Sequence, residues 1–295
     1  MYARIQPETN KECWLCILCV MFTVMFRCTI TEGFSCFPQT TSGKHERSWR
    51  SWRNLRLDIC YDGTRYRGWQ RLTGVENTIQ GKLEQTLSRI LGEDIEISGS
   101  GRTDAGAHAQ GQVANFHCES DLPCTEILSQ LRRYLPEDIG IYSCEDVHPR
   151  FHARLNAKSK TYCYRLWNSE EPCVFDRRFV YVDAQSLDLE RMQAAASVLI
   201  GEHDFSAFCA NKKMKKSTFR RVDSIEINRI GHEIRFTFTG NGFLYNMVRI
   251  MVGTLMEVGR GERSVESLSS LFGAKREDAG YLVPASGLCL MEVVY

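Results

Sequence analysis

The order of apolar and polar positions becomes regular from about residue 53 onward. Residues 55–59 alternate between apolar and polar side chains, which is typical of a strand with one buried face. Residues 78–91 carry apolar side chains at helical spacing, and Gly92 follows as a stop signal. The same reasoning predicts strands over 95–97, 113–117 and 139–147 and a helix over 125–135. The first half therefore predicts the order strand, helix, strand, strand, helix, strand.

The second half repeats this order. A strand over 161–167 and a helix over 187–199 are followed by two strands, over 219–227 and 234–238, that can pair through the turn near 228–231. A long apolar helix over 243–258, a short helix over 264–272 and a closing strand over 288–295 complete the series. We therefore expect an α+β fold of two ferredoxin-like βαββαβ units, with antiparallel sheets flanking a central cleft. The expected domains are 53–156, which holds the catalytic loop, and 157–295.

Residues 1–52 differ from the rest. Residues 13–26 form an apolar run that is shorter than the ~20 residues needed to cross a bilayer. Glu8 and Glu12 lie where a signal peptide carries positive charge. We interpret 1–52 as an extension that is disordered or poorly packed, with a membrane anchor or an export signal as the alternative.

Composition narrows the class of protein. The chain has 295 residues, of which 43% are hydrophobic and 25% charged, which is a globular composition. The formal net charge of +1 excludes nucleic-acid binding by bulk charge but leaves room for a local basic groove. The 13 cysteines are odd in number and irregularly spaced, which favours reduced thiols in the cytoplasm over a disulfide-stapled fold.

The segment SGSGRTDAGAH, residues 98–108, is the first candidate for chemistry. Its glycines give a freely shaped backbone whose N–H groups can hold an anion. Its only carboxylate, Asp104, could serve as a nucleophile, a base or a metal ligand. Because no second carboxylate or Cys/His pattern lies nearby, a metal is poorly supported. The alternative is a solvated turn.

The second candidate is Arg249, which lies among apolar residues of the predicted helix over 243–258. An unpaired guanidinium there would be costly, so it needs a carboxylate or an anionic ligand. Alternatively, Asn246, Arg249 and Gly253 form a solvent face of the helix. A pair between Asp104 and Arg249 would satisfy both groups.

Basic residues mixed with aromatic residues gather in three segments, 65–71, 150–164 and 212–221. Lys and Arg can follow phosphates while rings stack on unpaired bases. Each segment alone could be a solvated face. Together, on a chain of nearly zero net charge, they favour a groove for RNA.

From about residue 54 to residue 295 the chain resembles the tRNA pseudouridine synthase A family. The matching motifs are YDGTRYRGWQ at 61–70, SGRTDAGAHA at 100–109, FHAR at 151–154, KTYCYRLWN at 160–168, GEHDFSAF at 201–208, FLYNMVRIMVGTLMEVGRG at 243–261 and GLCLMEVVY at 287–295. Ala107 and Ile250 depart from the commoner Val and Asn, which should affect packing only. Residues 1–52 have no counterpart.

The resemblance implies an isomerase that converts uridines 38–40 in the anticodon arm of tRNA to pseudouridine. It implies a homodimer in the cytoplasm, with no cofactor, no metal and no membrane partner. Alternatives are a synthase for other RNA sites and a non-catalytic RNA-binding module. The implied roles are Asp104 as nucleophile, Arg249 as its basic partner, Tyr162 as the ring that stacks on the base, Arg102 as a loop and RNA-backbone contact, Leu288 in the uracil pocket, and Arg154 and Thr103 as further substrate contacts.

Overall fold

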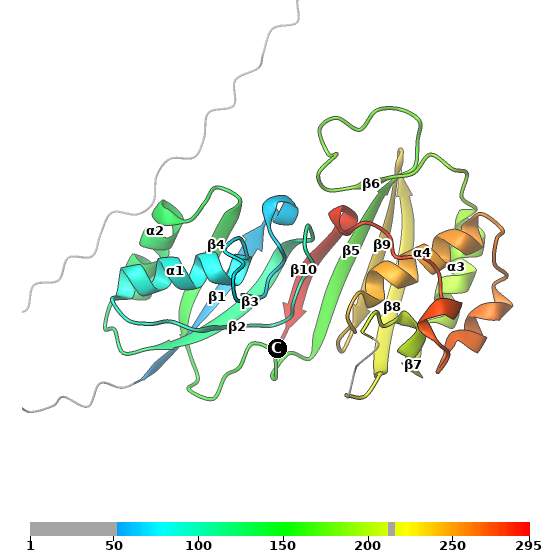
Figure 1. Cartoon of the computed structure of the whole chain (residues 1–295). Coiled ribbons are helices and arrows are strands. Elements are labelled where there is room, and N and C mark those ends of the chain that lie inside the picture. Colours follow the sequence, from blue (N-terminus) through cyan, green and yellow to red (C-terminus); the bar gives the residue numbers. More distant parts are fainter. Residues whose placement is uncertain (1–51, 212–215) are drawn as a thin grey trace, which may run out of the picture. The chain divides into compact units, whose positions relative to one another are not determined.

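The architecture rests on one mixed sheet whose strands come from both halves of the sequence (Figure 1). The computed structural model describes residues 52–211 and 216–295. The predictions made for residues 1–51, and for Lys212, Lys213 and Lys215 of the third basic segment, lie outside that range. Within the described part of the chain, the strand order is β4-β1-β3-β10-β5-β9-β8-β7, with β2 added to β3 and β6 added to β5.

The elements of the first half follow the predicted order. Thr78 caps α1 by accepting from the N–H of Gly81, and Gly92 ends the helix in the left-handed region. The elements are β1 (Arg53–Tyr61), α1 (Ile79–Leu91), β2 (Ile97–Gly99), β3 (His108–Cys118), α2 (Cys124–Tyr134) and β4 (Ile139–Val147).

The second half also follows the predicted order, with two short strands added and one helix shortened. The helix expected from residue 243 begins only at Met247, because Asn246 adopts a left-handed conformation with φ of 63°. The helix expected over 264–272 is a 3-10 helix, Glu266–Leu271. The elements are β5 (Ser159–Trp167), β6 (Tyr181–Val182), α3 (Leu189–Val198), β7 (Gly201–Asp204), β8 (Phe219–Ile230), β9 (Glu233–Gly240), α4 (Met247–Gly259) and β10 (Leu288–Val294).

The expectation of two separate antiparallel sheets is wrong, because β10 joins the halves. It pairs antiparallel with β5 and parallel with β3, where Cys289 lies opposite His108 and Leu290 opposite Ala109. The strands meet closely at Gly111, where a Cβ would lie 2.2 Å from the carbonyl oxygen of Met291. The sheet is therefore continuous and mixed. The ferredoxin-like description of each half and the domain boundary after residue 156 stay predictions.

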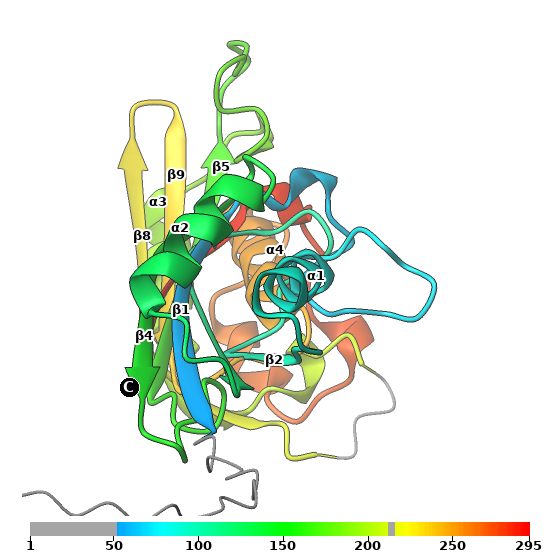
Figure 2. The ribbon, with the colours of Figure 1, turned by 90° about the vertical axis from the view of Figure 1, so that its left-hand side faces the viewer.

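One hydrophobic core runs along the sheet and through both halves. Helices α1 and α4 lie on the same side of the sheet, as Figure 2 shows edge-on. Leu57 of β1 and Tyr164 of β5 are fully buried on this core. No helix within residues 52–211 and 216–295 is long and apolar enough to cross a membrane.

Candidate active site

The loop that carries Asp104 leaves the sheet where the neighbour of β3 changes. β2 pairs with residues 114–116 of β3, while β10 pairs with β3 at His108 and Ala109. The loop over residues 100–107 connects β2 to β3 and therefore lies at the junction of the two halves. The chain order thus places a glycine-rich segment beside strands from both halves.

Buried polar contacts fix the first part of this loop. The backbone N–H of Ser100 donates to the carbonyl of Val113 at 2.7 Å, and its hydroxyl donates to Oε1 of Gln112 at 2.6 Å. Nε2 of Gln112 in turn donates to the carbonyl of Gly101 at 2.9 Å. Ser100 and Gln112 are fully buried. The alternative of a solvated turn is therefore wrong, since polar bonds hold the loop in place of apolar contacts.

Thr103 fixes the position of the neighbouring Asp104. Its hydroxyl lies 2.8 Å from the hydroxyl of Tyr61, and its carbonyl accepts from the N–H of Trp69 at 3.1 Å. Gly68 makes this approach possible, because its φ is +93° and a Cβ there would lie 2.7 Å from the Thr103 carbonyl oxygen. The segment before α1 therefore supports the loop from behind.

His108 holds the end of the loop. Its Nδ1 accepts from the backbone N–H of Gly63 at 3.1 Å, and its Nε2 lies 3.0 and 3.1 Å from the carbonyl oxygens of Arg178 and Ser286. Burial lowers the pKa of His108, although a carboxylate oxygen of Asp62 lies 3.2 Å from Nδ1 and opposes that shift. His108 therefore connects the loop to three other segments as a neutral side chain.

Arg249, in the first turn of α4, faces Asp104. Its Nη1 donates to Oδ2 of Asp104 at 2.8 Å and to Oδ1 of Asn246 at 3.1 Å, while Nε donates to the carbonyl of Val283 at 2.8 Å. The side chains of Arg249 and Asp104 are 12% and 16% exposed. Gly253, which belongs to the expected solvent face, is buried. The solvent-face alternative is therefore wrong, and the predicted pair exists.

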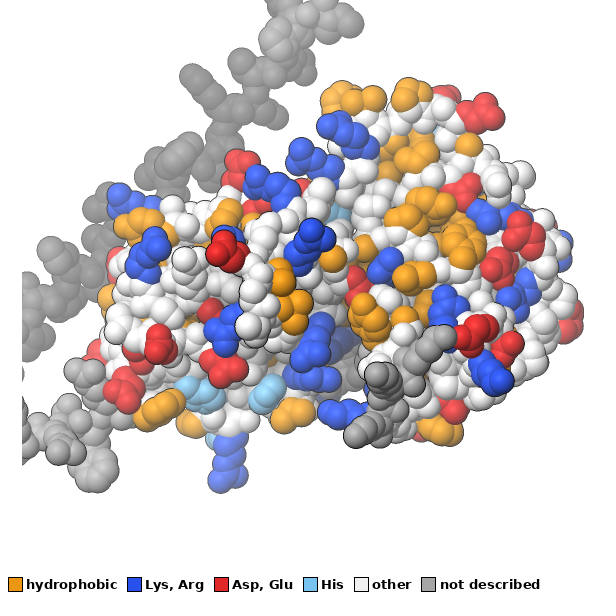
Figure 3. Space-filling model, viewed as in Figure 1, with side chains coloured by type: hydrophobic (Ala, Val, Ile, Leu, Met, Phe, Trp, Pro, Cys, Tyr) orange, Lys and Arg blue, Asp and Glu red, His pale blue; other side chains and the backbone are white. Residues whose placement is uncertain are grey.

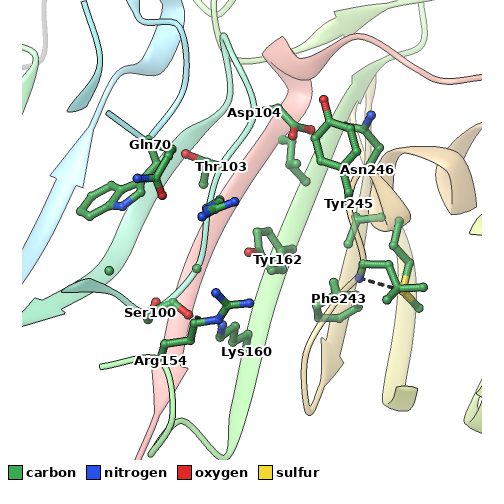
Figure 4. A pocket seen from close by; sticks show the side chains of 18 of the residues that line it. Gln70, Ser100, Thr103, Asp104, Arg154, Lys160, Tyr162, Phe243, Tyr245 and Asn246 are labelled. Carbon is green, nitrogen blue, oxygen red and sulfur yellow. Dashed lines mark hydrogen bonds between the residues drawn. The ribbon is translucent and has the colours of Figure 1, made fainter. Parts of the chain in front are cut away.

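Tyr162 of β5 presents a nearly buried ring to the same space. The ring is 7% exposed and meets the ring of Phe243 edge-on, with centroids 5.3 Å apart. Burial, and next the charge of Asp104, raise the pKa of Tyr162 far above its usual range. The phenol is thus neutral at physiological pH, and the ring offers an apolar surface beside a carboxylate (Figure 4).

These residues line a cleft of about 1000 Å³ between the two halves. Basic side chains gather around it, as the space-filling view shows (Figure 3). Its acidic side chains are Asp104 and Glu96. Its basic side chains are Arg102, Arg154, Lys160, Lys216, Arg220 and Arg249. The excess of cations therefore suits the binding of a polyanion, and the Asp104 carboxylate lies at the wall of this cleft.

All of the residues that the resemblance singles out line this cleft. They are Asp104, Arg249, Tyr162, Arg102, Leu288, Arg154 and Thr103. The basic segments 150–164 and 212–221 contribute cations to it. The segment 65–71 contributes Trp69 and Gln70 instead, because Arg65 pairs with Asp138 at 2.7 Å and Arg71 with Glu84 at 2.9 Å.

Phe243 and Tyr245 also line the cleft just before α4, and the sequence patterns predict no site role for them. The available signal is that both aromatic residues lie within six positions of Arg249 in the same motif. Within residues 52–211 and 216–295, no three His, Cys, Asp or Glu side chains form a group that could hold a metal ion.

A family profile described as tRNA pseudouridine synthase matches residues 59–156 and 195–295, which is more than half of the chain. The chain belongs to the tRNA pseudouridine synthase family. Members of this family are isomerases. Asp104, Arg154, Arg249 and Leu288 lie within the matched segments, and Tyr162 lies between them.

Individual relatives agree with this membership. The chain is 45% identical over 243 residues to tRNA pseudouridine synthase A 2 of a Bacillus cereus strain, covering 82% of this chain and 99% of the relative. It is 47% identical over 238 residues to tRNA pseudouridine synthase A of Bacillus sp. (strain KSM-64), covering 80% and 97%. It is 43% identical over 244 residues to tRNA pseudouridine synthase A 2 of Clostridium perfringens (strain 13 / Type A), covering 82% and 100%.

Proposed function

We propose that this protein isomerises uridines 38–40 in the anticodon arm of tRNA to pseudouridine, with Asp104 as the catalytic carboxylate. The pair between Asp104 and Arg249, at the wall of a cation-lined cleft, carries this proposal. Membership of the tRNA pseudouridine synthase family supports tRNA as the substrate. The position in the anticodon arm comes from the resemblance to the A family.

Access to the sugar requires that the target uridine leaves the base stack. A base in a helical stem hides its glycosidic bond, and enzymes that act on such bases flip them into a pocket. The cleft has room for a nucleotide, and Tyr162 offers its ring beside Asp104. We therefore assign to Tyr162 the role of stacking on the flipped uracil, with Leu288 closing the pocket.

The reaction needs no net change in atoms or electrons. The bond between C1′ and N1 breaks, the uracil turns while it is held on Tyr162, and a bond forms between C1′ and C5. The proton on C5 is lost, and N1 gains a proton. Asp104 either attacks C1′ and later leaves, or removes a proton from the sugar, and both roles suit an ionised carboxylate.

Arg249 supports either route because it holds the carboxylate at one position. Its bonds to Asn246 and Val283 fix the guanidinium before substrate arrives, so little reorganisation is needed. Thr103 holds the loop, and Arg102 and Arg154 are exposed cations at the cleft that can contact the RNA backbone. The homodimer stays a prediction of the resemblance, and sedimentation measurements test it.

Substitution of Asp104 by Asn tests the function. Tritium release from tRNA labelled at C5 of uridine reports the reaction, because the C5 proton is lost. We expect Asp104→Asn to abolish release while tRNA binding persists, and the exposed Asp94→Asn to behave like the parent protein. Release that persists in Asp104→Asn overturns the catalytic role. Release that persists from tRNA lacking uridines 38–40 overturns the assigned positions. Binding without release in the parent protein indicates a non-catalytic RNA-binding module.

A further inference from the structure

Three cations from three separate segments meet at one end of the cleft. Arg154 lies in the loop before β5, Lys160 is the second residue of β5, and Arg220 is the second residue of β8. All three line the cleft. Figure 4 shows Lys160 and Arg154 next to each other, with Tyr162 between them and Asp104. This cluster is therefore separate from the pair of Asp104 and Arg249.

No carboxylate in the described part of the chain neutralises this cluster. Lys160 donates from Nζ to the carbonyl of Ser100 at 2.5 Å, and Arg220 donates from Nη1 to the carbonyls of Ser217 and Phe219. Arg154 forms no ion pair with any described residue. Elsewhere in the same chain, Arg165 does pair with an acid, Glu233, at 2.7 Å.

The charge of Arg154 disfavours the charged forms of Lys160 and Arg220. Burial and then the charge of Arg154 lower the pKa of Lys160 to about 8. Burial, with a smaller contribution from Arg154, also lowers the pKa of Arg220. Like charges brought together without a counter-charge raise the free energy of the empty cleft. A bound anion removes this cost, so the cluster is built to receive one.

We propose that Arg154, Lys160 and Arg220 bind a backbone phosphate of the RNA next to the flipped nucleotide. This inference rests on the proposed function, which supplies an RNA in the cleft. Lys160 uses one N–H on Ser100 and keeps two for the phosphate, while a guanidinium can grip two phosphate oxygens at once.

Lys160 also connects the phosphate to the catalytic loop. Ser100 lies four residues before Asp104, at the start of the segment fixed by Gln112. A phosphate that holds the ammonium therefore also holds the carbonyl that begins the loop. Lys160 acts on the reaction as a positioning residue, through the loop and the RNA backbone.

The state of Lys160 sets a pH dependence for RNA binding. The ammonium binds the phosphate and the neutral amine does not, so affinity should fall as pH rises through about 8. The other charged or titratable residues that line the cleft with Lys160 are Glu96, Arg102, Asp104, His152, Arg154, Tyr162, Lys216, Arg220, Tyr245 and Arg249. The arginines remain charged, burial keeps the Tyr162 phenol neutral, and the Asp104→Asn background removes the carboxylate.

The experiment measures the Kd of an anticodon stem-loop RNA bound to the full-length Asp104→Asn protein. It is repeated at pH 7 and pH 9 and at several salt concentrations. We expect Lys160→Met to weaken binding ~10-fold at pH 7, as for one charge-assisted hydrogen bond. The Lys160→Met protein should also show no loss of RNA affinity between pH 7 and pH 9. Its slope of log Kd against log salt concentration should be smaller by ~0.7 to 0.9. Lys160→Arg should keep the affinity and lose the pH dependence.

A neutral methylphosphonate next to the target uridine provides a second test. It should weaken binding by the Asp104→Asn parent about as much as Lys160→Met does, and should have little further effect in the Lys160→Met protein. Arg89→Gln, an exposed cation on α1 outside the cleft, should change neither Kd nor the pH dependence.

Two results overturn the phosphate site. One is a Kd and a salt slope that Lys160→Met leaves unchanged. The other is a folded Lys160→Arg protein that binds as weakly as Lys160→Met, since this indicates packing and not charge. These results concern binding by an inactive protein, so they are distinct from failure of the proposed function, which the tritium release of the parent protein reports.

Discussion

Arg249 donates from Nη1 to Oδ2 of Asp104 at 2.8 Å, across 145 positions of sequence. Replacement of Arg249 by Gln should lower kcat by ~30- to 150-fold, which corresponds to about 2–3 kcal/mol for a charge-assisted hydrogen bond in the transition state. Arg249→Lys should retain more activity than Arg249→Gln, because it keeps the positive charge. The recovery should be partial, because the bond from Nε to the Val283 carbonyl is lost. Steady-state tritium release at saturating tRNA measures kcat. A kcat within threefold of the parent would show that the pair is structural only.

The ring of Tyr162 should matter more than its hydroxyl. Tyr162→Phe keeps the ring that packs against Phe243 and should retain activity within a few-fold. Tyr162→Ala removes the stacking surface, worth ~1–3 kcal/mol per base, and should lower kcat/KM by ~10- to 100-fold. Steady-state kinetics of both variants on the same tRNA decides. Equal losses in the two variants would assign the role to the hydroxyl.

Gly68 should be essential for the position of the catalytic loop. An Ala there would be strained at φ +93°, and its Cβ would collide with the Thr103 carbonyl. We therefore expect the unfolding free energy to fall by at least ~2–3 kcal/mol and kcat to fall as well. Gly74→Ala is the matched control, because its φ of +75° carries similar strain but a Cβ there meets nothing within 4 Å. It should cost ~1–2 kcal/mol and leave kcat unchanged. Urea unfolding and kinetics of both variants distinguish strain from collision.

His108 should make the fold less stable in mild acid. Its pKa is lowered in the folded protein, so the unfolded chain takes up a proton first as the pH falls below about 6.5, the usual value. The resulting loss of unfolding free energy is absent at pH 7.5 and reaches at most ~1.4 kcal/mol at pH 5.5. His108→Gln should therefore show a smaller difference in unfolding free energy between these two pH values. An unchanged difference contradicts the assigned neutral state.

Local pattern was enough to predict the order of the main helices and strands, although not the short strands β6 and β7. The helical spacing over 78–91 and the stop at Gly92 correspond to α1, Ile79–Leu91. The partner of Arg249 could also be predicted, because a guanidinium among apolar residues of a helix needs a negative group and Asp104 was the prominent candidate. Both inferences rest on the chemistry of side chains that the sequence names.

Contacts made by the backbone could not be predicted in this way. The single sheet depends on two parallel residue pairs, His108 with Cys289 and Ala109 with Leu290, and no alternation of apolar residues specifies which strands of the two halves meet. The hydrogen bond from Lys160 to the Ser100 carbonyl could not be predicted either. Every residue has a backbone carbonyl, so the sequence does not indicate which one accepts this bond. The start of α4 also depended on the backbone angle of Asn246.

The central place of β10 has a consequence for biosynthesis. Residues 288–294 are translated after every other strand of the sheet, yet they lie between β3 and β5. While the chain emerges from the ribosome, the segment with Asp104 and the strand with Tyr162 lack the partner that aligns them. If Asp104 acts as proposed, the emerging chain therefore carries this carboxylate in an unassembled site and becomes competent to act on RNA only when this late strand inserts.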